Sequence, residues 1–393
     1  MSDQILVLNA GSSSIKFAVF DAGVTLQRTV QGMISGIGAT TASFAASNAA
    51  GGALPGTLPG ATLTHDAALS WLFDWLDTGG HATRLRGAGH RVVHGGEQHA
   101  APILIDTGTL AGLEALAPLA PLHQPHNLAA IKALRKLRPA LAQVACFDTA
   151  FHRTQPAVAQ ALALPRRLTE TGLRRYGFHG LSYEYIAGSL PDVLGARANG
   201  RVIVAHLGNG ASLCALRERK SMATTMGFST LDGLVMGTRC GSIDSGALLY
   251  LMREKKMGVD ALEAVLYRES GLLGISGISS DMRTLLASTA PHAKFAIELF
   301  VYRAALETSA LAAALEGLDA LVFTGGIGEH AAAIRALICA RLGWMGVTLD
   351  EAANNRDATR ISTPESRVTV CVIPTDEEAV IARHTADRIG ILN

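Results

Sequence analysis

One structural unit occurs twice in this sequence, and the two copies begin about half a chain apart. In the first copy, an apolar run at 5–8 and an alternating run at 15–20 flank a Gly/Ser turn at 9–14. In the second copy, the runs 202–205 and 211–216 flank the turn at 206–210. Each copy predicts a β-hairpin, and the repetition indicates an internal duplication. The sequence therefore predicts two domains of the same topology, each beginning with a hairpin.

The length of 393 residues also favours two domains, because one hydrophobic core seldom serves so long a chain. We expect an α/β fold with a first domain at 1–149, a second at 150–377, and a C-terminal helix at 378–393 that packs back on the first. Further helical patterns occur at 126–138, 182–189, 245–257, 260–269 and 292–315. A strand at 321–323 runs into a glycine-rich loop at 324–329, and a helix is expected to begin near His330.

Charge and cysteine content exclude several classes of protein. Lys+Arg number 34 and Asp+Glu 33, so a net charge of +1 predicts neither a nucleic-acid nor a membrane partner. The five cysteines form no CxxC pair, which argues against a disulfide framework or a zinc site. The sequence has no signal-peptide pattern and no apolar run of about 18 residues. A cytoplasmic location is expected.

Three glycine-containing turns are candidate phosphate sites. They lie at 9–16, where Lys16 adds a charge, at 206–210, and at 325–329 between a strand and a helix. Backbone N–H groups in such turns, and a helix N-terminus, can point at phosphate oxygens. Taken alone, the first turn is equally consistent with an ordinary hairpin tip, the second is more typical of a tight hairpin turn, and a single glycine-rich loop such as the third is weak evidence. The occurrence of three favours a polyphosphate ligand.

Two arginines and a histidine stand among small residues. Arg91 lies in a run that ends His94-Gly95-Gly96, Arg239 is followed by Cys240-Gly241, and His179 lies between Phe178 and Gly180. Arginine in such a setting suits bidentate capture of a carboxylate or phosphate, and histidine can donate a hydrogen bond to a transferring phosphoryl group. A structural ion pair and a capping or core histidine are the alternatives.

Two carboxylates, Asp148 and Glu377, are expected at strand ends. Mg²⁺ is usually held by one or two carboxylates, with water completing its shell. The alternative for Asp148, and for Asp376 beside Glu377, is to cap a helix.

These segments together resemble the acetate kinase family of acetate and propionate kinases, which belongs to the wider fold group of actin and the sugar kinases. The resemblance runs nearly end to end through ten motifs. They are LNAGSSSIKF at 8–17, GHRVVHGGE at 89–97, PLHQPHN at 121–127, CFDTAFH at 146–152, RRYGFHGLS at 174–182, AHLGNGAS at 205–212, LVMGTRCG at 234–241, SSDMR at 279–283, FTGGIGE at 323–329 and PTDEE at 374–378.

The resemblance implies two domains of duplicated actin-like (ribonuclease H-like) topology with an active-site cleft between them. It implies a homodimeric phosphotransferase with a carboxyl group as acceptor, which moves the γ-phosphoryl group of ATP to acetate and yields ADP and acetyl phosphate. Asn9 and Glu377 would hold Mg²⁺, for which Mn²⁺ can substitute. The implied catalytic residues are Asp148, His179, Arg239 and Arg91, and those around the substrate are Arg91, Val93, Leu122 and Phe178. The implied ATP-binding residues are Lys16, His206, Leu207, Gly208, Asn209, Gly210, Asp281, Met282, Arg283, Gly325, Gly326, Ile327, Gly328 and Glu329.

Elementary chemistry modifies one implied role. A carboxylic acid with a pKa of roughly 4–5 is already ionised at neutral pH, so the acceptor has no proton to lose. Asp148 should therefore orient a cation or the phosphoryl group and not act as a general base. Arg91 would aim the carboxylate, while Arg239, His179 and Mg²⁺ would neutralise the phosphoryl oxygens.

Three positions depart from the family's motifs. Thr230 stands where the family has proline, Ser242 where it has an acidic residue, and Ser245 where it has a second proline. Propionate has one methylene more than acetate, and one methylene changes binding in an apolar pocket by only about 1–3 kcal/mol. Acetate and propionate are therefore both expected substrates. A propionate kinase, and a non-catalytic actin-like ATP-binding protein, are the alternatives. The physiological direction, the preferred nucleotide and the dimer surface stay open.

Overall fold

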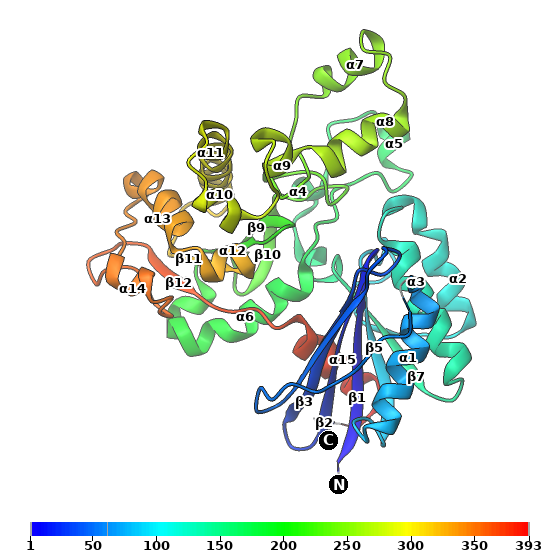
Figure 1. The fold of residues 1–393 in the computed structure, drawn as a ribbon. Helices are drawn as coiled ribbons and strands as arrows, with labels where there is room; N and C mark the ends of the chain where they lie inside the picture. The colour runs from blue at the N-terminus through cyan, green and yellow to red at the C-terminus, as the bar shows by residue number, and fades with distance from the viewer. Residues whose placement is uncertain (1, 61, 392–393) are drawn as a thin grey trace. The chain divides into compact units, whose positions relative to one another are not determined.

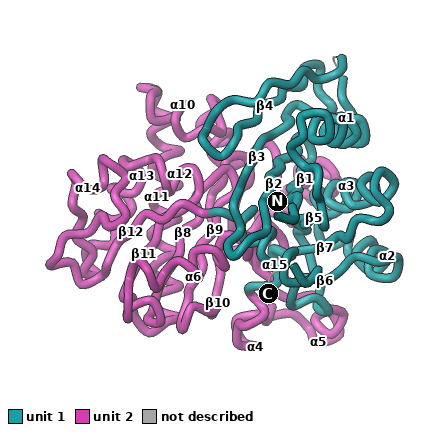
Figure 2. Tube along the Cα trace, turned by 90° about the horizontal axis from the view of Figure 1, so that it is seen from below, with its two compact units in different colours: residues 1–151, 376–393 teal, residues 152–375 magenta. Residues whose placement is uncertain are grey.

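The computed structural model describes residues 2–60 and 62–391, and the chain divides into two compact units (Figure 2). Unit 1 consists of Met1–Phe151 and Asp376–Asn393, and unit 2 of His152–Thr375. Each unit contains one β-sheet with helices packed against it. The expected α/β class is confirmed.

Unit 1 contains a seven-stranded sheet. Its elements are β1 (Asp3–Ala10), β2 (Ser14–Ala22), β3 (Leu26–Ser35), β4 (Ser43–Asn48), α1 (His65–Thr78), β5 (Leu85–Val92), β6 (Ile103–Leu104), α2 (Thr107–Ala115), the 3₁₀ turn Ala117–Leu119, α3 (Gln124–Leu137), β7 (Ala142–Phe147) and α15 (Glu377–Ile389).

Unit 2 contains a five-stranded sheet. The 3₁₀ turn Ala150–Thr154 spans the division. The elements that follow are α4 (Ala157–Gln160), α5 (Arg166–Thr169), α6 (Gly180–Leu194), the 3₁₀ turn Gly195–Asn199, β8 (Val202–Leu207), β9 (Ala211–Arg217), β10 (Lys220–Thr224), α7 (Ser245–Arg253), α8 (Val259–Ala264), the π-helical turn Val265–Glu269, α9 (Gly271–Ser276), α10 (Met282–Ala287), α11 (Pro291–Ala314), β11 (Ala320–Thr324), α12 (Gly325–His330), α13 (Ala332–Arg341), the 3₁₀ turn Gly343–Met345, α14 (Glu351–Asn355) and β12 (Thr369–Val372).

The two sheets share one topology. Unit 1 has the order β3-β2-β1-β5-β7 at the centre of its sheet, and unit 2 has β10-β9-β8-β11-β12. In both, the first three strands form antiparallel hairpins, and the last two run parallel to the first strand. The remaining pairs of unit 2 follow the same scheme. Both expected hairpins, β1–β2 and β8–β9, are therefore confirmed.

Helices cover both faces of the unit 1 sheet (Figure 1). On one face, α1 places Leu69, Leu72 and Leu76 at helical spacing into a core with Leu6, Leu8 and Phe17. On the other face, α15 packs on β1, β5 and β7. Gly89 of β5 permits this close approach, because a Cβ there would lie 2.2 Å from Thr385 Oγ1 of α15. Each fully buried leucine contributes about 1.5–3 kcal/mol.

The unit 2 sheet is buried at its centre. Every residue of β11 is buried, and all but one residue each of β8 and β9, which is the pattern of strands covered on both faces. The long helix α11 packs on β8, β9 and β10, and α6 on β8. No helix among the described residues has both the length and the apolar character that crossing a membrane requires.

Two differences from the sequence-based expectation concern predicted site residues. Residues 325–329, expected as a loop before a helix near His330, are helical and form α12. The Glu329 carboxylate accepts the Gly325 N–H at 2.8 Å and so closes this short turn. Asp376 and Glu377, expected at the end of the second domain, belong to unit 1. Asp376 caps α15 by accepting the Ala379 N–H at 2.9 Å, and it pairs with Arg28 of β3.

Candidate active site

The structure gathers nine of the predicted site residues into two clusters, one in each unit. The arginine–carboxylate cluster of unit 1 comprises Asn9, Arg91, Asp148 and Glu377. The histidine–arginine cluster of unit 2 comprises His179, His206, Asn209, Gly210 and Arg239.

Strand direction explains the arginine–carboxylate cluster. Asn9 lies near the end of β1, Arg91 near the end of β5, and Asp148 directly after β7. These three strands are parallel neighbours, so their carboxyl ends meet at one edge of the sheet, where α/β proteins bind ligands. Glu377 joins them as the first residue of α15.

Arg91 is the centre of this cluster. Its Nε lies 3.0 Å from Asp148 Oδ1 and its Nη2 lies 2.5 Å from Asp148 Oδ2, a bidentate pair. Its Nη1 lies 3.4 Å from Asn9 Oδ1, and its Nε lies 4.0 Å from Glu377 Oε2. The Asp148 side chain is only 1% exposed. One guanidinium therefore compensates a buried carboxylate and orients two further oxygen donors.

The electrostatics of the cluster follow from burial. Burial alone would lower the pKa of Arg91, but Asp148 and Glu377 raise it above its ordinary value, so the guanidinium stays charged. Burial raises the pKa of the Glu377 carboxyl to about 7, Arg91 opposes the rise, and Asp148 and Glu378 add to it. Burial is the largest cause of the rise in the pKa of Glu377, and the two neighbouring carboxylates contribute less.

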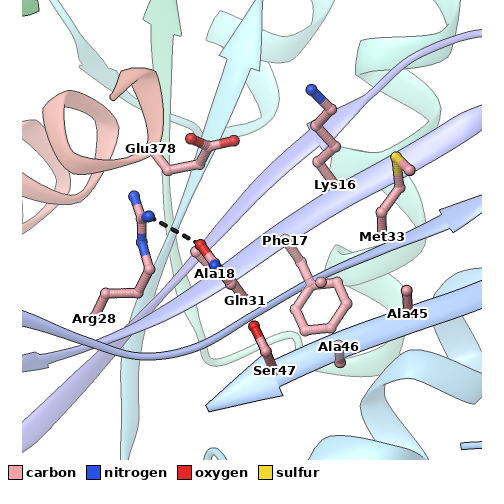
Figure 3. A pocket seen from close by; sticks show the side chains of 11 residues that line it. Lys16, Phe17, Ala18, Arg28, Gln31, Met33, Ala45, Ala46, Ser47 and Glu378 are labelled. Atoms are coloured by element: carbon pink, nitrogen blue, oxygen red, sulfur yellow. Dashed lines mark hydrogen bonds between the residues drawn. The ribbon is translucent and has the colours of Figure 1, made fainter. Parts of the chain in front are cut away.

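A hollow of about 390 Å³ lies beside Lys16 on the β2–β3–β4 side of the sheet (Figure 3). Lys16 and Glu378 line it together with Arg28 and Gln31, which are joined by a hydrogen bond of 2.9 Å. Because Arg28 also pairs with Asp376, the N-cap of α15, it fixes the first turn of the helix that carries Glu377.

The three apolar residues that are expected around the substrate do not belong to one unit. Val93 is buried and Leu122 partly buried in unit 1, whereas the buried Phe178 belongs to unit 2. In unit 1, Asn127 accepts the Val93 N–H at 3.0 Å and donates to the Ala10 carbonyl at 2.6 Å. Asn127 therefore ties the end of β5 to the tip of the first hairpin.

Strand ends also build the histidine–arginine cluster. His206 lies near the end of β8, whose parallel neighbour β11 leads into α12. A Cβ placed on Gly210 would lie 3.3 Å from His179 Nε2 and 3.6 Å from Arg239 Nη1, so both side chains reach the same hairpin tip. Arg239 Nη1 also donates to the Thr230 carbonyl at 3.1 Å. Two side-chain nitrogens, His179 Nε2 and Arg239 Nη1, therefore lie beside a glycine that has no side chain to fill the space.

Asn209 links the hairpin to the segment that carries Arg239. Its carbonyl accepts the Gly237 N–H at 2.9 Å. A Cβ on Gly237 would lie only 1.8 Å from Asn209 Oδ1, so only glycine fits at position 237 without displacing the asparagine.

His179 is held from two sides. It occupies the N-cap position of α6 with φ of 59°, a left-handed conformation that is rare for a residue with a side chain, and its ring makes no capping bond. Its Nδ1 lies 2.9 Å from Ser212 Oγ, and its ring stacks on that of His206 at a centroid distance of 4.4 Å. Strained, over-determined residues of this kind occur at functional sites.

The α12 segment is anchored internally. Besides the Gly325 N–H, Glu329 Oε1 accepts the Thr375 N–H at 3.2 Å. The fully buried Arg335 donates to the carbonyls of Gly328 at 3.0 Å and Glu329 at 2.8 Å. Glu329 and Arg335 therefore hold the shape of this segment from within.

The expected nucleotide residues of α10 form a separate pair in unit 2. Asp281 caps α10 by accepting the Arg283 N–H at 2.8 Å, and the bond from the Arg283 side chain lowers the pKa of Asp281 to about 2. Met282 is buried, whereas the Arg283 side chain is 90% exposed. An exposed guanidinium of this kind is available to a planar ligand.

The departures from the family motifs are accommodated locally. Thr230 contacts Arg239 through its backbone carbonyl, which a proline would also supply. Ser242 donates to Asp232 Oδ1 at 2.7 Å and accepts the Gly233 N–H at 3.0 Å. Ser245 is the first residue of α7, where Asp244 provides the cap.

Comparison with known proteins decides the family. The Acetokinase family profile matches residues 4–383. The chain belongs to the acetokinase family. It is 58% identical over 390 residues to an acetate kinase of Rhodopseudomonas palustris strain TIE-1, covering 98% of each chain. It is 48% identical over 397 residues to an acetate kinase of Rhizobium meliloti, covering all of both chains.

Solved structures of this family agree with the fold. A propionate kinase from Francisella tularensis superposes with a TM-score of 0.93 at 38% identity, covering 98% of this chain and 100% of the other. The acetate kinase of Porphyromonas gingivalis gives 0.88 at 35%, covering 99% and 100%. The chain is therefore an enzyme of the acetokinase family, a kinase and not a non-catalytic ATP-binding protein.

Four supporting residues were not predicted from the sequence. Ser212 lies inside the motif AHLGNGAS, which could have indicated it. Tyr183, Arg335 and Arg28 lie outside the ten motifs, and their contacts depend on segments distant in sequence. Only the tertiary structure identifies them.

Proposed function

We propose that this enzyme transfers the γ-phosphoryl group of ATP directly to acetate, reversibly, giving acetyl phosphate and ADP. The observation that carries the proposal is the convergence of His179 Nε2 and Arg239 Nη1 on Gly210 at the hairpin tip. Phosphoryl transfer needs donors placed where negative charge gathers on the equatorial oxygens. The choice of acetate is supported by the names of relatives up to 58% identical.

The arginine–carboxylate cluster is assigned to the acceptor and the metal. Arg91 stays charged and is 21% exposed, so its guanidinium can pair with the acetate carboxylate. Val93, Leu122 and Phe178 are assigned to the methyl group. Acetate arrives ionised, so no general base is required. Asp148, locked against Arg91 by two hydrogen bonds, fixes the direction in which that guanidinium points.

The same cluster fits a divalent cation. Asn9 and Glu377 offer oxygen ligands, which hard cations such as Mg²⁺ prefer, and the nearby carboxylates of Asp148 and Glu378 favour a cation beside Glu377. We assign Mg²⁺ to Asn9 and Glu377, with Mn²⁺ as a substitute. When bound, the ion neutralises phosphate charge. The protein's part is to hold the two donors, through Arg91 and through the Arg28–Asp376 pair at the start of α15.

The nucleotide is assigned to unit 2 and to Lys16. The hairpin tip at 206–210 offers backbone donors to phosphates, as does the segment 325–329, and the Asp281–Arg283 pair is assigned to the nucleoside. His179 and Arg239 stabilise charge on the transferring group. No step requires a covalent phosphoenzyme.

An assay with hydroxylamine trapping of acyl phosphate tests the activity. Purified enzyme with ATP, Mg²⁺ and acetate is expected to form the hydroxamate, and absence of trapped product would refute the proposal. Comparison of kcat/KM for acetate, propionate and butyrate tests the substrate. The propionate kinase alternative is not favoured, because its relative is 38% identical whereas an acetate kinase is 58% identical.

We also propose a homodimer that acts in the cytoplasm. Helix α11 exposes Phe295 (58%), Tyr302 (47%) and Leu306 (44%), which lie on one stripe at helical spacing. Large exposed apolar groups on one stripe are typical of a protein–protein surface. Light scattering after gel filtration is expected to give twice the mass of the 41.0 kDa chain.

A further inference from the structure

A chain of buried hydroxyl groups ends on His179. Tyr183 Oη lies 2.5 Å from Ser212 Oγ, and Ser212 Oγ lies 2.9 Å from His179 Nδ1. Tyr183 and Ser212 are fully buried. Tyr183 lies in the first turn of α6, and its backbone N–H donates to the His179 carbonyl at 3.1 Å. Ser212 is the second residue of β9, directly after the hairpin tip.

Ser212 contacts one of the two ring nitrogens of His179, and the other nitrogen lies toward the hairpin tip. Nδ1 is engaged by Ser212, while Nε2 is the atom that lies toward Gly210, beside Arg239 Nη1. A neutral imidazole carries one proton, on either nitrogen. With the proton on Nδ1, Nε2 would present a lone pair to an anionic phosphoryl oxygen. With the proton on Nε2, the ring would donate a hydrogen bond beside Arg239.

Tyr183 can set the direction of hydrogen bonding by donating to Ser212. Burial raises the pKa of Tyr183 well above its ordinary value, so its hydroxyl keeps its proton. A buried hydroxyl group is normally hydrogen-bonded, and the Tyr183 proton can go to Ser212 Oγ. Ser212 Oγ has one proton and two lone pairs. With Tyr183 as its donor, Ser212 has His179 Nδ1 as the second contact to which its own proton can go, and that bond would leave the imidazole proton on Nε2. Without either hydroxyl, the preference for a proton on His179 Nε2 over Nδ1 would be lost.

We propose that Ser212 and Tyr183 are positioning residues that hold His179 as the neutral Nε2–H tautomer, ready to donate to the transferring phosphoryl group. The catalytic part of this inference rests on the proposed function. The tautomer does not, because it is a property of the free protein. The ring of His206, stacked on that of His179 and hydrogen-bonded through Nδ1 to Ser182 Oγ at 2.8 Å, adds the second constraint on the plane of the ring.

Nitrogen NMR of the unliganded enzyme, labelled with ¹⁵N in histidine, tests the tautomer directly. His179→Asn identifies the signals of position 179. We expect Nδ1 in the unprotonated range and Nε2 in the protonated range at neutral pH. An Nδ1–H tautomer, a doubly protonated ring or rapid averaging of the two tautomers would overturn the proposal, whether or not the enzyme makes acetyl phosphate.

Two deletions of a hydroxyl test the kinetic consequence. Ser212→Ala and Tyr183→Phe should each lower kcat by about 10–100-fold, the range that applies when a metal-bound histidine loses its outer hydrogen-bond partner, with the KM for acetate nearly unchanged. The double variant should be hardly slower than Ser212→Ala, because both hydroxyls act through one nitrogen.

Ser366→Ala is the matched control. Ser366 is also a buried serine of unit 2, and its hydroxyl donates to the Val368 carbonyl at 2.7 Å. It should lose stability much as Ser212→Ala does, yet keep the wild-type kcat and the Nε2–H signal of His179. An equal loss of kcat in Ser366→Ala, or wild-type kcat in Ser212→Ala, would contradict the positioning role.

Discussion

Removal of Arg91 should damage the enzyme in two separable ways. The Asp148 side chain is 1% exposed and bonded to Arg91 at 3.0 and 2.5 Å, so Arg91→Ala leaves a buried carboxylate without its partner. Loss of one member of a buried pair costs about 3–5 kcal/mol. The kcat/KM for acetate should fall by about 10²–10³, the scale for loss of a charge-stabilising donor.

A second substitution separates the two effects. In Arg91→Ala with Asp148→Asn the buried charge is gone, so at least half of the lost stability should return. Activity should not return, because the acceptor still lacks its guanidinium. Arg239→Ala is the comparison in unit 2, with the same expected loss in kcat/KM.

Tryptophan fluorescence can follow unit 1 alone. Of the three tryptophans, Trp71 and Trp75 lie in unit 1, and Trp344 is 74% exposed in unit 2. In a Trp344→Phe background, urea unfolding therefore reports on the unit that contains Arg91, which avoids treating two units as one transition. A loss of less than about 1 kcal/mol in Arg91→Ala, or activity regained in the double variant, would refute the reasoning.

Three further variants test other parts of the structure. Arg335→Met should destabilise unit 2 by about 2–6 kcal/mol, since two carbonyls of α12 lose their donor and each unsatisfied buried polar group costs about 1–3 kcal/mol. It should also raise the KM for ATP. Near-wild-type thermal unfolding would contradict this. Burial lowers the pKa of His90 to about 4, so the unfolded chain takes up the proton at a higher pH than the folded one. The free energy of unfolding therefore falls as the pH drops from about 6.5 to 4. At pH 5 the loss due to His90 should be about 2 kcal/mol. His90→Leu should reduce that decline in urea titrations at pH 7 and 5, and an unchanged slope would exclude His90 as its source. Gly237→Ala should displace Asn209 and raise the KM for ATP about tenfold. Gly188→Ala in α6 is the control, because a Cβ there meets nothing within 4 Å. It should keep full activity and increase the free energy of unfolding by up to about 1 kcal/mol.

Local patterns in the sequence predicted the elements more reliably than their ends. The hairpins were predictable because alternating apolar residues around a Gly/Ser turn specify one another over short distances. The segment 325–330 was not, because three of its residues are glycines with poor helix propensity. Glu329, bonded to the Gly325 N–H, stabilises that turn by a contact that propensity does not encode.

By itself the sequence determined the duplication, the α/β class and the residue types available for phosphoryl transfer, because these depend on order and spacing along the chain. Only the tertiary structure decided which of these residues meet. Arg91 and Asp148 pair because β5 and β7 are parallel neighbours that end together. His179 meets Ser212 because α6 begins beside the start of β9. The hairpin that occurs in both units thus contributes residues to the cluster of each unit. Contacts between segments distant in sequence position the side chains of each cluster.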